Sequence, residues 1–239
     1  MKTEDIDYAD GALRLRGFLA YDETIAGKRP GVVVVHEAWG LGEHVIERAK
    51  MLAGLGYVAF AADMYGDRRQ ATSLPDAMQL IGDMRTDPAK LRARGAAAVA
   101  VLAALPQVDA SRLAGIGFCF GGTSVLELAR SGADLAGVVS FHGGLETAAP
   151  AAAGAVKARV LVCTGADDPM IPSAQVTGFE DEMRRAGADW QVIRYGGTVH
   201  SFTNPAADGS IIPGVLYNAR TDRRSWTAMR AFFDEIFAA

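Results

Sequence analysis

The sequence predicts an α/β fold in which a mostly parallel sheet of about eight strands carries helices on both faces. Short runs rich in β-branched residues alternate with longer helical patterns, which is typical of a parallel sheet covered by helices. One run, Val32–Val35, consists of four valines, as expected for a strand buried on both faces. Of the 239 residues, 50% are hydrophobic and 22% are charged, and no break in composition marks a linker. We therefore expect one domain over residues 1–239.

The first half of the chain opens with a predicted hairpin, because apolar and polar residues alternate on both sides of a turn at Asp10-Gly11. The valine strand is followed by a helix, which Gly56 ends. A longer helical region breaks near Asp87-Pro88, because the residue before proline avoids the helical conformation. These patterns predict strands at 6–8, 13–21, 31–35 and 57–61, and helical segments at 43–55 and 74–105.

The second half of the chain continues the alternation and ends in an amphipathic helix. The patterns predict strands at 113–116, 135–141, 160–163 and 190–195, and helices at 123–130, 173–186 and 220–237. Eight strands with interleaved helices satisfy the requirements of an α/β-hydrolase fold.

A candidate nucleophile lies between the fifth predicted strand and its helix, in Gly117-Phe118-Cys119-Phe120-Gly121. This is the G-x-S-x-G turn with cysteine in place of serine. The sharp turn pushes the central side chain into solvent, and the flanking glycines let the two backbones approach each other. A thiol with an ordinary pKa of about 8.5 is only a few per cent thiolate near neutral pH. Cys119 therefore needs a base.

The base and its acid are expected in the order nucleophile, acid, histidine. Of the four histidines, at 36, 44, 142 and 200, only the last two follow the turn. His200 lies in a glycine-rich segment just past the last strand, where it can reach over the carboxyl edge of the sheet. Asp167 and Asp168 follow the preceding strand, and their position does not separate them. Because aspartate before proline favours a turn, we expect one of them to form the turn and the other to orient His200.

An oxyanion hole requires two N–H donors, one from the residue after the nucleophile and one from the loop after an early strand. Phe120 supplies the first, and the loop His36–Gly40 is expected to supply the second. Glu37 in that loop is either a proton acceptor for the thiol or a solvated loop residue.

Together these segments resemble the dienelactone hydrolase family (carboxymethylenebutenolidase-like) of α/β-hydrolases. The resemblance covers about residues 4–238 and is carried by four pieces in the right order: His36-Glu37-Ala38-Trp39-Gly40, Gly117-Phe118-Cys119-Phe120-Gly121-Gly122, Gly165-Ala166-Asp167-Asp168-Pro169-Met170-Ile171-Pro172 and His200-Ser201-Phe202.

The resemblance implies roles for six residues. Cys119 is the nucleophile, His200 the base and Asp168 the acid. Glu37 is the further carboxylate that takes the thiol proton, and the N–H groups of Phe120 and Ala38 form the oxyanion hole. The implied reaction is acylation of the cysteine by a small ester or lactone, followed by hydrolysis of the thioester.

The chain departs from the family pattern around the substrate. The dienelactone enzymes hold a substrate carboxylate with arginines, one of them shortly after the catalytic histidine, whereas His200 is followed by no arginine up to Pro205. Candidate replacements are Arg68, Arg69 and Arg85. His142 stands where that enzyme has a tyrosine. We expect the substrate-binding residues to be Trp39, Tyr65 and His142. Ester or lactone hydrolysis follows from the resemblance, but a dienelactone substrate does not.

Two alternatives stay open: a thioesterase or other hydrolase acting at the same site, and a non-catalytic α/β-hydrolase-fold binding protein. No metal or cofactor is expected, because the chain has no H-x-x-x-H spacing and no G-x-x-x-x-G-K loop.

Composition excludes further classes. A net charge of −4 argues against a nucleic-acid partner. The N-terminus is acidic, no apolar run is long enough to span a bilayer, and the two cysteines have no disulfide spacing. We expect a cytoplasmic enzyme, a monomer or weak dimer, acting on a small-molecule ester or lactone.

Overall fold

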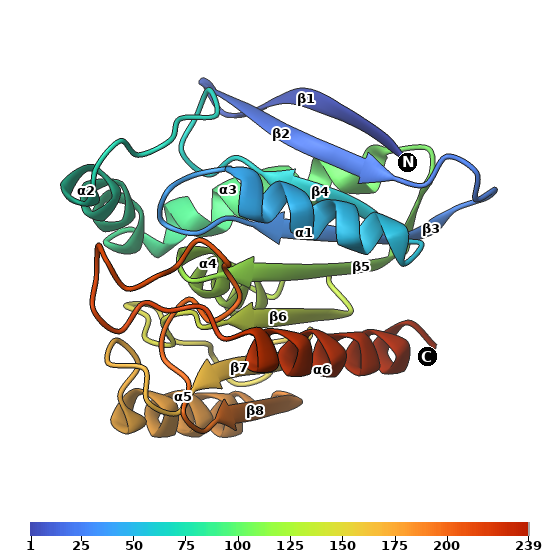
Figure 1. Ribbon diagram of the computed structural model, residues 1–239. Coiled ribbons are helices and arrows are strands. Elements are labelled where there is room, and N and C mark those ends of the chain that lie inside the picture. The colour runs from blue at the N-terminus through green and yellow to red at the C-terminus, as the bar shows by residue number, and fades with distance from the viewer. Residues whose placement is uncertain (239) are drawn as a thin grey trace.

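The computed structural model describes residues 1–238, which form one eight-stranded sheet and six helices (Figure 1). The sheet order is β1-β2-β4-β3-β5-β6-β7-β8. Its strands are β1 (Lys2–Asp10), β2 (Leu13–Tyr21), β3 (Arg29–Val35), β4 (Val58–Ala62), β5 (Val108–Phe118), β6 (Gly137–Phe141), β7 (Arg159–Gly165) and β8 (Trp190–Tyr195). The helices are α1 (Glu43–Gly54), α2 (Leu74–Arg85), α3 (Pro88–Ala104), α4 (Phe120–Arg130), α5 (Ser173–Ala186) and α6 (Ala219–Ala238). The predicted fold class is confirmed.

The strands from β3 to β8 run parallel, and only the β1–β2 hairpin at one edge introduces antiparallel pairing. The carboxyl ends of the parallel strands therefore meet at one edge of the sheet. Figure 1 shows α2 and the segment before α6 at this same end of the molecule. Ligands of open α/β sheets bind at this edge.

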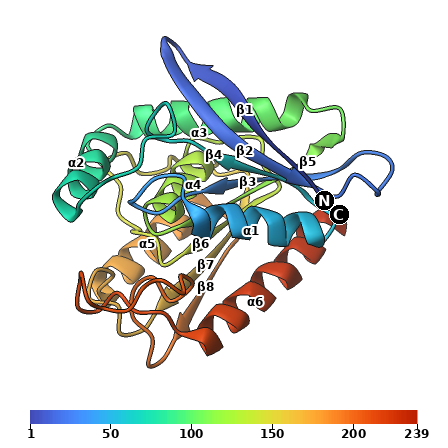
Figure 2. The ribbon, with the colours of Figure 1, turned by 45° about the horizontal axis from the view of Figure 1, so that its top comes forward.

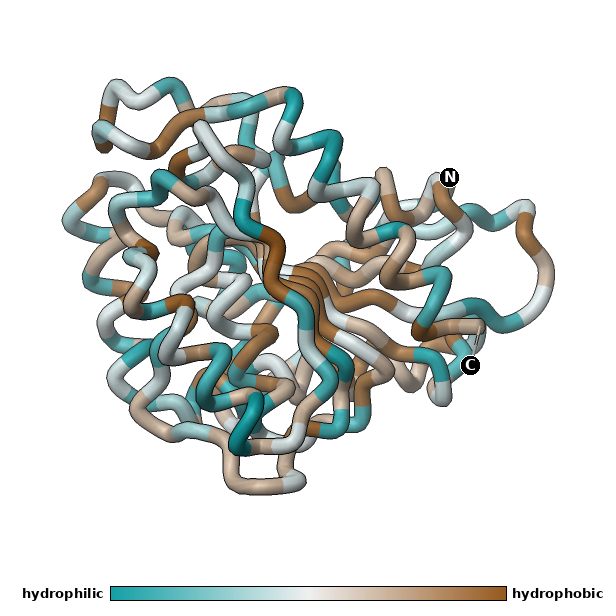
Figure 3. The backbone as a smooth tube through the Cα atoms, turned by 90° about the horizontal axis from the view of Figure 1, so that it is seen from below, coloured by the Kyte–Doolittle hydropathy of each residue, from teal (hydrophilic) through white to brown (hydrophobic). Residues whose placement is uncertain are grey.

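Each face of the sheet has its own apolar core. α1 and α6 cover one face, where Leu52 and Phe233 pack against β-strand residues such as Val34. The helices α3, α4 and α5 cover the other face, as Figure 2 shows. The hydrophobic strands consequently lie in the middle of the molecule, with polar segments outside them (Figure 3). Burial on both faces explains the valine run in β3, whose four valines are fully buried.

Helix α4 begins at Phe120, three residues before the predicted start at Thr123. Glycine lowers helix propensity, so Gly121-Gly122 conceals the first turn in the sequence. The structure needs both glycines, because a Cβ at Gly121 would overlap the Val35 carbonyl and a Cβ at Gly122 would overlap Ser140 and Gly143. Close packing of α4 on the sheet thus outweighs helix propensity.

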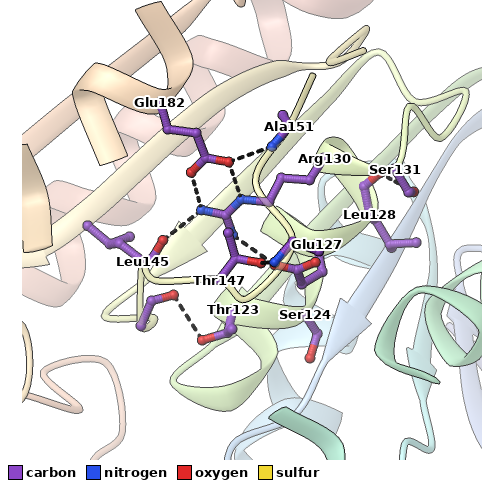
Figure 4. Close-up of polar contacts among 12 residues, drawn as sticks. Thr123, Ser124, Glu127, Leu128, Arg130, Ser131, Leu145, Thr147, Ala151 and Glu182 are labelled. Carbon is purple, nitrogen blue, oxygen red and sulfur yellow. Dashed lines mark hydrogen bonds and ion pairs between the residues drawn. The ribbon is translucent and has the colours of Figure 1, made fainter. Parts of the chain in front are cut away.

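The other end of α4 carries a buried ion-pair cluster (Figure 4). Arg130 binds both carboxylate oxygens of Glu182 on α5, at 2.9 and 2.8 Å, and also pairs with Glu127 at 3.1 Å. Its guanidinium donates to the Leu145 carbonyl as well, at 2.6 Å. Glu182 accepts a further bond from the Ala151 N–H. The cluster therefore joins α4, α5 and the segment after β6.

Candidate active site

Cys119 lies at the turn between β5 and α4 with a φ of 53°, a conformation that is strained for a residue with a side chain. The turn is so tight that a Cβ at Gly117 would overlap the Gly121 backbone. The glycines of the pentapeptide are thus required by close approach, as the motif predicts. The strained turn leaves the thiol partly exposed at the carboxyl edge of the sheet.

His200 and Asp168 form a buried hydrogen-bonded pair. The His200 Nδ1–H donates to Asp168 Oδ2 at 2.7 Å, and His200 Nε2 is buried without a hydrogen bond to any of residues 1–238. The other oxygen of Asp168 accepts the Met170 N–H at 2.8 Å. The prediction that one aspartate forms the turn and the other contacts His200 is therefore wrong. Asp168 both forms the turn and contacts His200, because its two oxygens serve the two donors, while Asp167 makes its backbone bond to Thr198.

The pKa of His200 is strongly shifted. Burial alone would lower it, but negative charge on the neighbouring Cys119 and the bond with Asp168 raise it to about 10. The arrangement thus favours the protonated form of the His200 imidazole.

The N–H groups of Phe120 and Ala38 donate no hydrogen bond to any residue between 1 and 238, and both residues line the same cavity as Cys119. His36 holds the peptide that carries the Ala38 N–H. The Met64 N–H donates to His36 Nε2 at 3.2 Å, so the ring proton is on Nδ1, which donates to the Glu37 carbonyl at 2.6 Å. Burial lowers the pKa of His36 and keeps the ring neutral.

His142 lies beneath the turn and is fully buried. Its Nδ1 accepts the Cys119 N–H at 3.1 Å, so its Nε2–H donates to Thr203 Oγ1 at 2.7 Å. Burial and the nearby charge of His200 hold the pKa of His142 well below its ordinary value. The Cys119 N–H also donates to the Phe141 carbonyl at 3.0 Å, so the neutral His142 ring and this carbonyl together hold the backbone of Cys119.

Glu37 is buried at the edge of the cavity. Its Oε2 accepts from Asn204 Nδ2 at 2.7 Å and lies 3.3 Å from His44 Nδ1, while Oε1 accepts no bond from residues 1–238. Burial would raise the pKa of Glu37, but His44, Asn204 and the charge of His200 outweigh it and lower the pKa. Glu37 is thus an anion with one oxygen free.

These groups open into a cavity of about 370 Å³, a volume typical of a small-molecule site. Trp39 and Arg85 line it, whereas Tyr65 and His142 do not. Tyr65 instead stacks on Phe120 and donates from its hydroxyl to the Ala38 carbonyl at 2.9 Å. Of the other two arginines, Arg68 pairs with Asp5 and Arg69 pairs with Asp76.

The chain is matched over residues 15–237 by the model of the Dienelactone hydrolase family. It belongs to this family. The chain is therefore an ester- or lactone-cleaving hydrolase with an α/β-hydrolase fold.

Three similar proteins align with 84–98% of the chain. A crystal structure of a dienelactone-hydrolase-like promiscuous phosphotriesterase from metagenomic libraries is 47% identical, covers 98% of both chains and superposes with a TM-score of 0.93. A candidate carboxymethylenebutenolidase of Synechocystis is 25% identical over 98% of this chain and 96% of its own. A candidate 2-oxo-3-(5-oxofuran-2-ylidene)propanoate lactonase of Bradyrhizobium is 29% identical over 84% of this chain and 86% of its own.

In the part of the chain that the structure describes, no helix is both long and apolar enough to cross a membrane. No group of three or more histidine, cysteine, aspartate or glutamate side chains within residues 1–238 is arranged to hold a metal ion.

The sequence motifs missed two parts of the site. His36 and Asn204 act through hydrogen bonds that only the folded chain creates, although His36 lies in a recognised motif. The cavity wall formed by residues 206–215 has no periodicity that could place it. Its position beside His200 follows from two backbone contacts, His200 N–H to the Gly214 carbonyl and Leu216 N–H to the His200 carbonyl.

Proposed function

We propose that this dienelactone hydrolase family member is a thiol hydrolase of small esters or lactones, with Cys119 as nucleophile, His200 as general base and Asp168 as its orienting acid. The observation that carries the proposal is the bond of 2.7 Å between His200 and Asp168. It leaves His200 Nε2, which has no hydrogen-bond partner within residues 1–238, next to the thiol. A base that is oriented by a third group and faces a thiol supports an activated nucleophile.

In the first half-reaction the thiolate attacks the carbonyl carbon and the carbonyl electron pair moves to oxygen. The unpaired N–H groups of Phe120 and Ala38 receive this oxyanion. When the intermediate collapses, the carbon–oxygen bond to the alcohol breaks and His200 Nε2 gives its proton to the departing oxygen. In the second half-reaction water loses a proton to His200 and attacks the thioester, which releases the acid and the thiolate.

Glu37 supplies a second place for the thiol proton. Its Oε1 has no partner in the described chain, and its lowered pKa keeps it ionised at neutral pH. An enzyme tuned to a thiol in this way handles a serine hydroxyl poorly, because the hydroxyl is far less acidic. We expect Cys119→Ser to keep the fold and lose most ester turnover. Wild-type-like activity of Cys119→Ser would contradict the role of Glu37.

A second candidate substrate class is neutral phosphotriesters. It is favoured by the 47% identity with the promiscuous phosphotriesterase over 98% of both chains. The same thiolate would attack phosphorus, an aryloxide would leave with the His200 proton, and water would hydrolyse the sulfur–phosphorus bond. Thioesters, by contrast, would be cleaved as esters are, by attack of the thiolate on the carbonyl carbon.

The test compares the wild type with Cys119→Ala on p-nitrophenyl acetate, an acyl thioester, a dialkyl aryl phosphate, and lactones with and without a carboxylate. Cys163→Ala is the matched control, because Cys163 is buried in β7 and burial raises its pKa to about 12. We expect hydrolysis to vanish in Cys119→Ala only. Unchanged turnover in that variant refutes the thiol mechanism, and no turnover by the wild type favours a non-catalytic binding protein.

Whether a substrate carboxylate is anchored is tested separately with Arg85→Ala, since Arg85 is the arginine of the cavity. Loss confined to carboxylate-bearing lactones would identify Arg85 as that anchor. Equal effects on all lactones would exclude such a role.

A further inference from the structure

The cavity beside Cys119 has two apolar walls. One is the inner side of α2, with Leu74, Ala77, Met78 and Ile81. The other is the segment before α6, which contributes Ile211, Ile212 and Val215. Figures 1 and 2 both show α2 and this segment at the same end of the sheet, beyond its carboxyl edge.

The apolar lining continues outward to the mouth of the cavity. Met78 is 55% exposed, Met170 is 41% exposed and Ile211 is 63% exposed, and all three line this cavity. Single exposed apolar side chains are common on proteins, but several around one opening mark a binding site. The mouth is therefore suited to a ligand that is apolar beyond its reacting group.

The charges in the cavity disfavour an anionic ligand near the thiol. Besides Cys119 and His200, the ionisable side chains in the lining are Glu37, Asp208 and Arg85. A substrate carboxylate would meet the two acidic groups, and the exposed Arg85 would compensate only one charge. A neutral ester carries no such cost.

The position of His200 assigns one wall to each half of the ester. A general acid must reach the leaving oxygen, so the alcohol lies on the His200 side. The His200 backbone is bonded to Gly214 and Leu216 at 3.1 and 3.0 Å, which places the segment before α6 on that side. The acyl group then extends toward α2, whose Ile81 shares an apolar cluster with Phe120.

We propose that the α2 wall is an acyl subsite for the linear apolar chain of a neutral ester. This inference rests on the proposed thiol hydrolase and adds its substrate class. Burying each methylene of the acyl chain improves binding of the transition state by up to about fourfold. The rate constant kcat/KM should therefore rise with acyl length until the cavity of about 370 Å³ is filled.

The experiment measures kcat/KM for p-nitrophenyl acetate, butyrate, hexanoate and octanoate, which share one leaving group. We expect the wild type to prefer the longer esters by at least about tenfold over acetate. Met78→Glu places a carboxylate on the α2 wall and should flatten this series. Ile211→Glu changes the other wall and should leave the ratio of hexanoate to acetate unchanged. Met51→Glu is the matched control, a methionine on α1 with 43% exposure that does not line this cavity.

The outcomes separate the two proposals. A flat series in an active wild type overturns the acyl subsite and leaves the thiol hydrolase intact. Flattening by Ile211→Glu but not by Met78→Glu overturns the assignment of the walls. No hydrolysis of any p-nitrophenyl ester refutes the proposed function itself.

A separate observation concerns the oxyanion hole. The Glu37 carbonyl and the Ala38 N–H belong to one peptide plane, so they point in opposite directions. The His36 Nδ1–H binds that carbonyl at 2.6 Å, and His36 is fixed in this tautomer by the Met64 N–H. The ring therefore keeps the Ala38 N–H turned away from the protein interior and toward the cavity that Ala38 lines.

We infer that His36 is a positioning residue, which keeps the Ala38 donor aimed at the oxyanion of the proposed reaction. If the peptide rotated, the carbonyl would face the oxyanion and oppose it. Loss of one oxyanion donor typically costs about 10²–10³ in kcat. Alkylation of Cys119 by iodoacetamide passes through no oxyanion, so its rate should not change when His36 is substituted.

Two variants test the two ring nitrogens of His36 separately. In His36→Asn the amide nitrogen takes the place of Nδ1 and can still donate to the Glu37 carbonyl, whereas in His36→Gln the amide takes the place of Nε2. We expect His36→Gln to lower kcat for p-nitrophenyl acetate about a hundredfold with little change in KM, and His36→Asn to recover most of it.

The readout is the ratio of kcat per folded molecule to the rate constant for loss of ester activity during treatment with iodoacetamide, a rate constant to which only active molecules contribute. A fall in this ratio for His36→Gln supports the inference. Parallel loss of both rates would mean that His36 is merely structural, and unchanged ester turnover would overturn its role.

Discussion

The two ends of helix α4 differ in how their polar groups are satisfied. At the C-terminal end, the buried Arg130 has partners in Glu127, Glu182 and the Leu145 carbonyl (Figure 4). At the N-terminal end, the Phe120 N–H donates no bond within residues 1–238, and Cys119 has a strained φ of 53°. Buried polar groups are ordinarily paired, and exceptions need a reason. The paired end stabilises the helix, whereas the unpaired end keeps its groups free for a substrate.

The same contrast applies to the surroundings of the N-terminal end. His200 Nε2 is a buried nitrogen without a partner in the described chain, although its Nδ1 is held by Asp168. Strain and unsatisfied groups cost folding free energy, so they persist only where the rest of the structure compensates. Changes at the unpaired end should therefore affect activity, and changes at the paired end should affect stability.

The largest expected effect is on activity at the unpaired end. Asp168→Asn keeps the shape of the side chain but removes the charge that holds the His200 Nδ1–H, so we expect kcat to fall by about 10⁴. Ester hydrolysis under saturating substrate measures it, and thermal unfolding reports on the fold. Asp167→Asn is the matched control, since Asp167 contacts its surroundings through the backbone. Equal losses in the two variants would contradict the pairing.

The next largest effect is on stability at the paired end. Arg130→Met leaves the buried Glu182 without its arginine partner and leaves the buried Glu127 with Arg92 alone, which lies 2.8 Å from its Oε2. Breaking a buried pair in this way costs about 3–5 kcal/mol of unfolding free energy. Urea unfolding measures the loss, and kcat per folded molecule at low temperature should stay within about threefold of the wild type.

The control for Arg130→Met is Arg159→Met. Arg159 is 36% exposed and pairs with Asp189 and Glu235 at 3.4 and 3.5 Å. A surface pair of this kind contributes about 0–1 kcal/mol. If both variants lost equal stability, the buried cluster would not have the role assigned to it.

The sequence motifs located the residues of the candidate site better than the walls of its cavity. The pieces around Cys119, Asp168 and His200 are local motifs, because each depends on a strand end and the turn that follows it. The cavity walls depend instead on how α2 and the segment before α6 sit over the sheet. The helical pattern of α2 was visible in the sequence, but the cavity it lines is set by tertiary packing.

Two predictions, one wrong and one confirmed, show which features the local sequence can predict. His142 was expected to bind substrate, since it follows β6 at the carboxyl edge, but the chain turns it inward with a φ of 42° to hold the Cys119 N–H. The break between α2 and α3 was predictable, because Pro88 starts α3 and Asp87 caps it by accepting the Lys90 N–H at 3.2 Å. Helix starts and caps can be predicted from the local sequence, whereas the direction of a side chain at a strand end cannot.

The raised pKa of His200 also predicts that the free energy of unfolding depends on pH. The pKa of His200 rises from its ordinary 6.5 to about 10 on folding, so the native state binds this proton more tightly than the unfolded state does. The resulting stabilisation is complete below about pH 6.5 and is lost as the pH rises toward about 10. The difference in unfolding free energy between the wild type and His200→Gln should shrink over that range.

Cys119→Ala sharpens this test, because negative charge on Cys119 is the largest influence that raises the pKa of His200. In that variant the stabilisation should be smaller, and its loss should be complete at a lower pH. A difference that grows with pH in the wild-type comparison would show that the pKa of His200 is lowered instead.

The smallest expected effect concerns Glu37, which is paired at one oxygen and unpaired at the other. Its Oε2 has partners, whereas its Oε1 accepts no bond from residues 1–238. Asn204→Ala removes the donor at 2.7 Å, and burial then raises the pKa of Glu37. If the ionised carboxylate accepts the thiol proton as proposed, activity on the acidic side should be lost at a higher pH, by up to about one unit. The acidic limb of the kcat/KM profile measures the shift, and Gln191→Ala, an exposed amide on β8, is the control. An unshifted limb in Asn204→Ala would show that the Glu37 carboxylate takes no part in proton transfer from the thiol, and the proton would then pass between Cys119 and His200 alone.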